Sequence, residues 1–215
     1  MRKKLFIFDV DGTLVNSYIA IQRSLNFALG KLGHPKVSYQ RVKRSVGRGD
    51  KIFILNFFSP KDMARALKIY RDHHKKSLLT YSKLRPQARL LLKALKRRGS
   101  ILGVASNRPS PFTDIILKKL GIKKYFGYIL CADQIRSLKP NPKILNSIVK
   151  KFSLNKQESV FIGDMDIDLE AAQRAGIDAI FVKGGSSSLK SVAKYKDKKT
   201  VAHLSQILNL YSKSN

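Results

Sequence analysis

The chain has 215 residues, of which 43% are hydrophobic, 43 are basic and 14 are acidic, so its formal net charge is +29. This length suits one domain with an insertion or two small domains, and the hydrophobic content is sufficient for a packed core. The single cysteine, Cys131, excludes an intrachain disulfide, and no apolar run is long enough to predict a membrane span. The apolar run after the basic N-terminus ends at Asp9, which is too short for a secretory signal, so we predict a cytoplasmic protein.

The positive charge attracts phosphates and raises the arrival rate of anionic substrates. It is also compatible with binding to nucleic acid. The sequence contains no RNA-binding motif, no zinc pattern and no stripe in which aromatic and basic residues alternate. We therefore favour a lysine-rich solvated surface over a dedicated nucleic-acid interface.

The first predicted element is a strand at residues 5–8, where Leu, Phe, Ile and Phe form an apolar run without a polar break. Such a run is typical of a strand that is buried on both faces. It is followed at once by Asp9 and Asp11, then by Gly12 and Thr13. Burying two carboxylates without partners is unfavourable, so the pattern indicates a metal or a reacting group at the end of this strand.

The next part of the chain is predicted to be helical throughout. Apolar residues recur at helical spacing and breaks occur at glycines and prolines. The helices are predicted at residues 18–32, 38–46, 52–58 and 61–79. Because no strand interrupts them, we expect residues 16–81 to form a helical cap inserted into an α/β core.

The core, residues 1–15 and 82–215, is predicted to alternate strands and helices. This alternation indicates a Rossmann-like, doubly wound parallel sheet with right-handed crossovers. The glycine-rich segment 184–188 is predicted to be a loop and the basic run 194–199 a solvated turn. Strands are predicted at residues 101–105, 128–130, 160–163 and 179–182. Helices are predicted from Pro86 to Gly99, from Pro109 or Pro111 to Leu120, and at residues 142–152, 169–175 and 204–211.

Acidic residues are rare in this chain, and more than a third of them lie in two clusters. The first contains Asp9 and Asp11, and the second contains Asp164, Asp166 and Asp168 after the strand at 160–163. Two acidic clusters in a basic protein indicate a cation site, and Mg²⁺ prefers such oxygen ligands. Asp166 has no assigned role.

Two further strand or loop ends carry groups suited to phosphate. Ser106 and Asn107 follow the strand at 101–105, where a hydroxyl and nearby amides can donate to a phosphate oxygen. Lys139 precedes Pro140, which disfavours a helical conformation and places the lysine in an extended segment before a helix.

In order and spacing, these four motifs resemble those of the haloacid dehalogenase-like hydrolase superfamily. The resemblance implies that Asp9 is a nucleophile that takes up a phosphoryl group, and that Asp11 is a general acid and base. It implies that Lys139 neutralises phosphate charge and orients Asp9. Mg²⁺ would be bound by Asp9, the main-chain carbonyl of Asp11 and Asp164, while Asp168 would orient a water or Lys139.

The same resemblance assigns Thr13, Ser106 and Asn107 to the transferring phosphoryl group. The presence of Asp11 favours phosphate esters over dehalogenation, and the helical insertion resembles the cap of phosphoglycolate phosphatase-like enzymes. We therefore predict a phosphatase acting on a small phosphorylated metabolite, as a monomer or weak dimer. Arg48, in a glycine-flanked cap loop, is predicted to bind an acidic group of the substrate, with an exposed structural arginine as the equal alternative.

Other functions remain open on the same motifs. A β-phosphoglucomutase-like phosphomutase would share every core motif, and a pyrophosphatase or nucleotidase is also compatible. The alternative of a different class is a basic nucleic-acid-associated protein, for which steeply salt-dependent RNA binding would be the discriminating observation.

Overall fold

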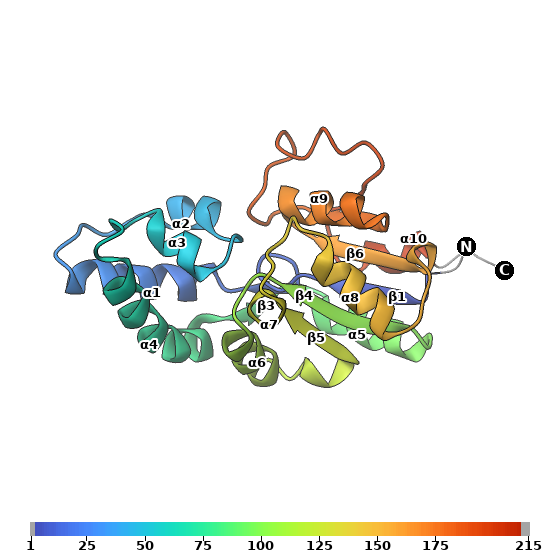
Figure 1. Cartoon of the computed structure of the whole chain (residues 1–215). Helices are drawn as coiled ribbons and strands as arrows, with labels where there is room; N and C mark the ends of the chain where they lie inside the picture. Colours follow the sequence, from blue (N-terminus) through green and yellow to red (C-terminus); the bar gives the residue numbers. More distant parts are fainter. Residues whose placement is uncertain (1–2, 212–215) are drawn as a thin grey trace.

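The computed structural model describes residues 3–211 and consists of a parallel sheet flanked by helices, with a separate group of helices at one end (Figure 1). The sheet has six strands in the order β5-β4-β1-β6-β7-β8, and every neighbouring pair is parallel. The predicted α/β fold with a parallel sheet is confirmed. The strands are β1 (Leu5–Phe8), β4 (Ile101–Ser106), β5 (Tyr128–Cys131), β6 (Ser159–Gly163), β7 (Asp178–Val182) and β8 (Lys199–Val201).

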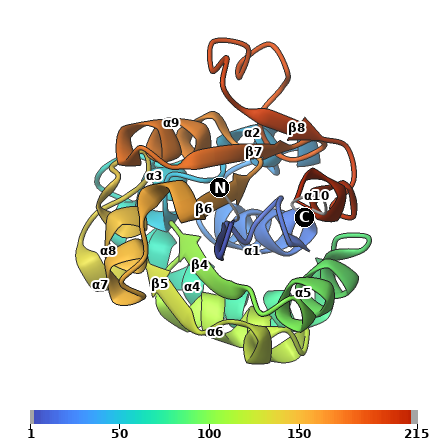
Figure 2. The same cartoon turned by 90° about the vertical axis from the view of Figure 1, so that its right-hand side faces the viewer.

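The alternation of side chains along β1 divides the core between the two faces of the sheet. Phe6 and Phe8 pack into one apolar cluster, whereas Leu5 and Ile7 pack into another. Figure 2 shows α8 and α9 on one side of the sheet and α5 and α10 on the other. The helices of the core are α5 (Ala88–Arg97), α6 (Ser110–Lys119), α7 (Ala132–Ile135), α8 (Lys143–Lys151), α9 (Asp166–Ala175) and α10 (Gln206–Leu210), with 3₁₀ turns at Lys123–Tyr125 and Lys156–Glu158.

The position of β1 determines where a ligand site can form. It lies between β4 and β6: the chain first adds β4 and β5 on one side of β1, and then crosses back to add β6, β7 and β8 on the other side. In an open α/β sheet, the crevice beyond the carboxyl ends of the strands at such a reversal is the usual ligand site. The motifs after β1, β4 and β6 therefore meet at one edge.

Four helices between residues 18 and 81 form the group at the end of the molecule. They have an apolar cluster of their own, which includes Leu25, Val42, Phe53 and Ile54. The helices are α1 (Tyr18–Lys31), α2 (Tyr39–Ser45), α3 (Asp50–Leu55) and α4 (Met63–Tyr81). We propose that this group is the cap expected from the sequence.

Where the chain enters and leaves the cap, two short strands pair. β2 (Val15–Asn16) and β3 (Lys83–Leu84) form an antiparallel two-stranded sheet. This pairing was not predicted, and it supports the proposed division of the chain near residues 16 and 82. No helix in residues 3–211 is long and apolar enough to cross a membrane.

Two sequence predictions in the core are wrong in detail. The basic run 194–199 is not only a solvated turn, because Lys199 begins the edge strand β8, of which only Val201 is buried. Helix α9 begins at Asp166 rather than at residue 169, so Asp166 and Asp168 both lie in its first turn, where acidic side chains are favoured.

Candidate active site

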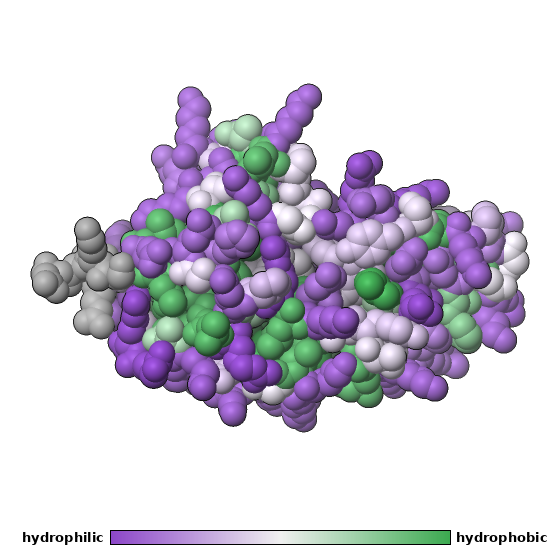
Figure 3. Space-filling view, turned by 180° about the vertical axis from the view of Figure 1, so that it is seen from behind, coloured by the Kyte–Doolittle hydropathy of each residue, from purple (hydrophilic) through white to green (hydrophobic). Residues whose placement is uncertain are grey.

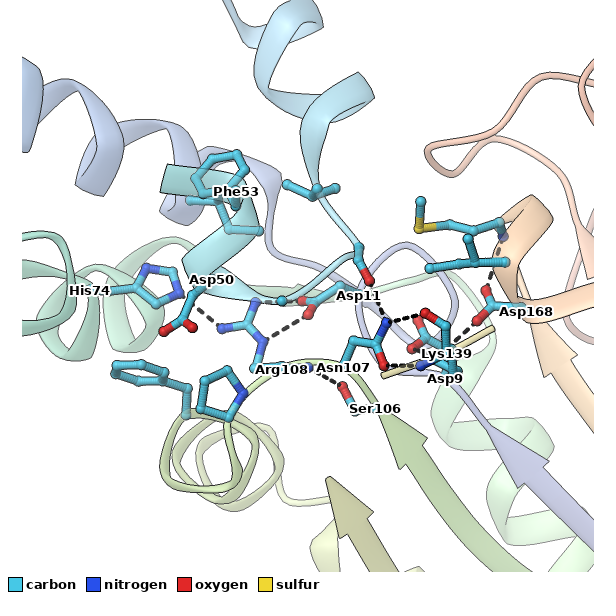
Figure 4. Close-up of a pocket in the computed structure, with 18 of the residues that line it drawn as sticks. Asp9, Asp11, Asp50, Phe53, His74, Ser106, Asn107, Arg108, Lys139 and Asp168 are labelled. Carbon is cyan, nitrogen blue, oxygen red and sulfur yellow. Dashed lines mark hydrogen bonds and ion pairs between the residues drawn. The ribbon is translucent and has the colours of Figure 1, made fainter. Parts of the chain in front are cut away.

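At the carboxyl end of β1 a lysine lies between two buried carboxylates. The Nζ atom of Lys139 is 2.6 Å from Oδ1 of Asp9 and 2.8 Å from Oδ1 of Asp168. Figure 4 shows the three side chains. Their exposed fractions are 7% for Asp9, 3% for Lys139 and 1% for Asp168. Burial by itself disfavours the ammonium, yet Asp168 and Asp9 raise the pKa of Lys139 above its usual value. The lysine therefore stays charged and fixes the position of Asp9.

Lys139 is itself held by the loop after β4. Its Nζ donates to the carbonyl of Ala105 at 3.0 Å, and its main-chain N–H donates to Oδ1 of Asn107 at 2.8 Å. The amide of Asn107 donates in turn to the carbonyls of Lys139 at 3.1 Å and Gly47 at 2.8 Å. Because Gly47 belongs to the cap segment, Asn107 ties the cap to the loop that carries Lys139.

Asp164, after β6, completes the acidic group. Thr13 donates its hydroxyl to Oδ1 of Asp164 at 2.9 Å, and the N–H of Ser186 donates to Oδ2 at 2.7 Å. The hydroxyl of Tyr18, from the cap, lies 3.3 Å from the same Oδ2 and 2.9 Å from Oγ of Ser186. Asp164 is thus held by both the core and the cap.

The acidic group is suited to a cation. Carboxylate oxygens of Asp9, Asp164 and Asp168 all lie within 4.8 Å of one another, and all three residues are buried. Burial and the nearby acids raise the pKa of Asp9 well above its usual range. Burial, followed by the charge of Asp168, raises the pKa of Asp164 to about 7. A bound metal ion would offset this repulsion, so the residues present fit a metal, with Asp9 and Asp164 as ligands and Asp168 engaged by Lys139.

Asp11 lies on the other side of Asp9, and its carboxylate is paired with an arginine. Arg108 donates through Nε to Oδ2 of Asp11 at 2.7 Å and through Nη2 to Oδ1 at 2.6 Å. The hydroxyl of Ser17 also donates to Oδ1. On its far side Arg108 reaches the cap, where its Nη1 is 2.9 Å from Nε2 of His74. A bidentate pair of this kind is among the stronger polar contacts in proteins.

A cavity between the cap and the core opens onto these residues. The volume that the centre of a water-sized group can occupy in this cavity is about 60 Å³. The core contributes most of the polar lining, and the cap contributes apolar side chains together with Asp50 and His74. The lining includes Asp9, Asp11, Ser106, Arg108, Lys139 and Asp168 from the core, and Ile21, Val46, Phe53 and Tyr70 from the cap.

The structure brings most of the predicted site residues together, with some differences in contact. Ser106 lines the cavity and accepts the main-chain N–H of Arg108 at 3.1 Å. Thr13 is fully buried and donates to Asp164 instead of facing the cavity. Asp166 does not join the acidic group, since it bonds with Ser187 in the loop after β7.

Arg48 is brought neither to the cavity nor to the buried acidic group. Arg48 is exposed, and although its neighbours Gly47 and Gly49 line the cavity, Arg48 does not. The arginine at the cavity is Arg108. The glycines on both sides of Arg48 let the main chain approach the core, and this leaves the side chain between them directed elsewhere.

Sequence reasoning missed Arg108, His74, Tyr18 and Ser186. Arg108 directly follows Ser106 and Asn107, and this proximity to a strand end was the available signal. The other three carried no local signal, because their contacts join residues far apart in the chain.

Comparison with known proteins shows the family to which the chain belongs. The family model for haloacid dehalogenase-like hydrolase matches residues 6–182. A protein named phosphoglycolate phosphatase from Yersinia pestis is 29% identical over 208 residues, with 94% of this chain and 90% of that protein covered. One of the same name from Photorhabdus laumondii is 32% identical, with 86% and 82% covered. The crystal structure of a predicted phosphoglycolate phosphatase from Haemophilus somnus superposes with a TM-score of 0.92 at 26% identity and 98% coverage of both chains. The protein described here belongs to the haloacid dehalogenase-like hydrolase family.

Proposed function

We propose that the protein is a Mg²⁺-dependent phosphatase that hydrolyses a small phosphomonoester of the phosphoglycolate class. The observation that carries this proposal is the buried group of Asp9, Lys139 and Asp164 at the carboxyl end of β1. It combines a fixed carboxylate nucleophile, a charged lysine and an acidic group suited to a metal, and Asp9 and Lys139 of this group line the cavity. The relatives named phosphoglycolate phosphatases support the substrate class.

In the proposed mechanism an oxygen of Asp9 attacks the phosphorus of the ester and the bond to the alcohol oxygen breaks. Asp11 gives a proton to that oxygen, then takes a proton from the water that hydrolyses the aspartyl-phosphate, which regenerates Asp9. Lys139 and the polar groups at Ser106 and Asn107 stabilise the charge on the transferring group. Asp9, Asp164 and the main-chain carbonyl of Asp11 would hold Mg²⁺. When bound, the metal would neutralise further negative charge on the phosphate and favour its binding next to Asp9.

The size of the cavity supports a small substrate. Between the cap and the core, the volume that the centre of a water-sized group can occupy is only about 60 Å³. Apolar cap residues line one side of this space. A large leaving group would require the cap to move away from the core. The predictions of a cytoplasmic location, of a monomer or weak dimer, and of no favoured nucleic-acid partner stay predictions.

The proposal is tested by measuring phosphate release from a panel of substrates with Mg²⁺ and with a chelator. The panel contains phosphoglycolate, hexose phosphates, nucleoside monophosphates and pyrophosphate. We expect phosphoglycolate to have the highest kcat/KM and all activity to need the metal. Isomerisation of a hexose phosphate without phosphate release would instead indicate a phosphomutase, and a preference for nucleotides or pyrophosphate would contradict the substrate class.

A further inference from the structure

Arg108 occupies a position between the catalytic aspartate and the cap. Three of its five N–H groups are used by Asp11 and Ser17, and a fourth points to Nε2 of His74. The side chain is almost fully buried. Its guanidinium therefore forms part of the cavity wall at the point where the cap meets the core (Figure 4).

The cavity holds few positive charges. Among the described residues that line it, only Lys139 and Arg108 have side chains that are cationic in their ordinary state at neutral pH. Lys139 is already bound to Asp9 and Asp168, next to the position of the transferring phosphoryl group. Arg108 is therefore the cation available to any other anionic group of a substrate.

His74 is arranged to hold Arg108 without repelling it. Burial, together with the charge of Arg108, lowers the pKa of His74 well below its usual value, so the imidazole is neutral. Its Nδ1 lies 3.0 Å from Oγ of Ser24, and Oγ of Ser24 donates to the carbonyl of Ala20 at 2.9 Å. This chain leaves Nε2 as the acceptor for Arg108. The ring is also stacked on Tyr70, with centroids 4.8 Å apart.

The paired state of Asp11 conflicts with its proposed role. Oδ1 accepts from Arg108 and Ser17, and Oδ2 accepts from Arg108, so the guanidinium engages both oxygens. To donate a proton to the leaving oxygen, Asp11 must release one of these contacts and take up a proton from water. In a carboxylated ester such as phosphoglycolate, the carboxylate is two bonds from the leaving oxygen, so it arrives beside Asp11 and within reach of the same guanidinium.

We propose that Arg108 binds the carboxylate of the substrate in exchange for Asp11, and thereby frees Asp11 to act on the leaving oxygen. This inference rests on the proposed phosphatase function. It assigns the recognition of the second anion to Arg108, and it links recognition to catalysis because one guanidinium serves both carboxylates in turn. His74 acts as a positioning residue that keeps the guanidinium at the cap after Asp11 has left.

The test compares phosphoglycolate with ethyl phosphate, in which a methyl group replaces the carboxylate. The variant Arg108→Gln removes the positive charge and the pair of parallel N–H donors of the guanidinium. For phosphoglycolate we expect kcat/KM to fall about a hundredfold, since a buried charge-assisted pair is lost. For ethyl phosphate we expect kcat to rise severalfold, because Asp11 is no longer held. Arg108→Lys keeps the positive charge but lacks the paired N–H donors of the guanidinium. It should retain part of the preference for phosphoglycolate.

A matched control is Arg44→Gln, which removes the same charge from an exposed position on the cap. It should leave both substrates unchanged. A binding measurement separates recognition from turnover: in an Asp9→Asn background, phosphoglycolate should raise Tm more than ethyl phosphate does, and adding Arg108→Gln should remove that difference.

The outcomes are distinct. If wild type hydrolyses neither ester, the proposed function fails. If wild type hydrolyses phosphoglycolate but Arg108→Gln lowers both substrates to the same degree, or leaves ethyl phosphate no faster, the exchange between Asp11 and substrate is overturned. If Arg108→Gln leaves phosphoglycolate unaffected, Arg108 does not bind the second anion.

Discussion

At the scale of single residues, Asp164 shows why we expect the site to bind a cation. Its carboxylate is fully buried and accepts hydrogen bonds from Thr13 and Ser186, yet its pKa is raised to about 7 by burial and by Asp168. Two hydrogen bonds to the ionised form do not compensate for the loss of water. Without a cation, the folded protein therefore favours the protonated acid.

The pH dependence of stability follows from the direction of this shift. Because the folded-state pKa of Asp164 lies above the unfolded value, the acid binds its proton more tightly in the folded protein. Its contribution to stability is present at low pH and is lost as pH rises from about 4 towards 7. In chelator, we expect Asp164→Asn to be more stable than wild type by roughly 2–4 kcal/mol at about pH 8, and by far less at about pH 4.

Thermal melts of both proteins across this pH range give the measurement. Comparing the variant with wild type at each pH cancels the repulsion among the many basic groups. Added Mg²⁺ should raise the Tm of wild type more at high pH than at low pH, and should raise that of Asp164→Asn little. A constant Tm difference at all pH values would contradict the account of Asp164.

At the scale of elements, the site depends on a glycine in the loop after β7. A Cβ placed on Gly185 would lie 2.0 Å from Oδ2 of Asp164. Gly185→Ala should therefore displace Asp164 and weaken the Mg²⁺-induced rise in Tm, with apparent metal affinity at least about tenfold lower. The same substitution at Gly30, in α1, meets no atom within 4 Å.

Gly30→Ala is thus the matched control for this prediction. It should raise stability by roughly 0.5–1 kcal/mol through helix propensity, and leave the metal response unchanged. Titrations of Tm with Mg²⁺ measure both effects. A wild-type metal response in Gly185→Ala would show that the loop does not limit the position of Asp164.

Most elements of the core could be predicted because their local patterns are strong. The apolar runs at β1, β4 and β6 are buried on both faces, so periodicity, length and burial give the same answer. β8 was not predicted, since a strand of three residues at the edge of the sheet buries only Val201. The pair β2–β3 was missed for a similar reason, because each strand has only two residues and the whole cap separates them in the sequence.

The candidate site was predictable where the chemistry is local. Asp9, Asp164 and Lys139 follow strands or precede a proline, and the sheet then places them together. The arginine at the cavity could not be identified in this way. Arg48 and Arg108 both lie near glycine or strand-end signals, and the contacts that hold Arg108 at the cavity, with Asp11 and with His74 of α4, join residues far apart in the chain.

At the scale of the whole molecule, the charge distribution favours anionic substrates. The cap, residues 16–81, carries 14 basic and 3 acidic residues. The face in Figure 3 is largely hydrophilic, with separate hydrophobic areas among the polar side chains. A positive field over the entrance should raise the encounter rate with phosphate esters, and salt should screen it.

We expect kcat/KM for phosphoglycolate to fall as ionic strength rises from about 0.02 to 0.5 M, by roughly tenfold, because the Debye length shortens from about 20 Å to about 4 Å. The value of kcat should change little, since Asp9, Lys139 and Asp164 are buried and poorly screened. Initial rates at several salt concentrations test this. An equal loss of kcat would point to salt acting on the site and not on the approach of the substrate.

The central claim is that Asp9 forms a covalent aspartyl-phosphate. The most direct measurement is rapid quenching during turnover, reduction with borohydride and peptide mass spectrometry, because borohydride converts an acyl phosphate of aspartate into homoserine. The account predicts homoserine at position 9 in wild type with substrate and Mg²⁺, and none in Asp9→Asn, whose turnover should be lost. Homoserine at position 11 instead, or turnover that persists in Asp9→Asn, would contradict it.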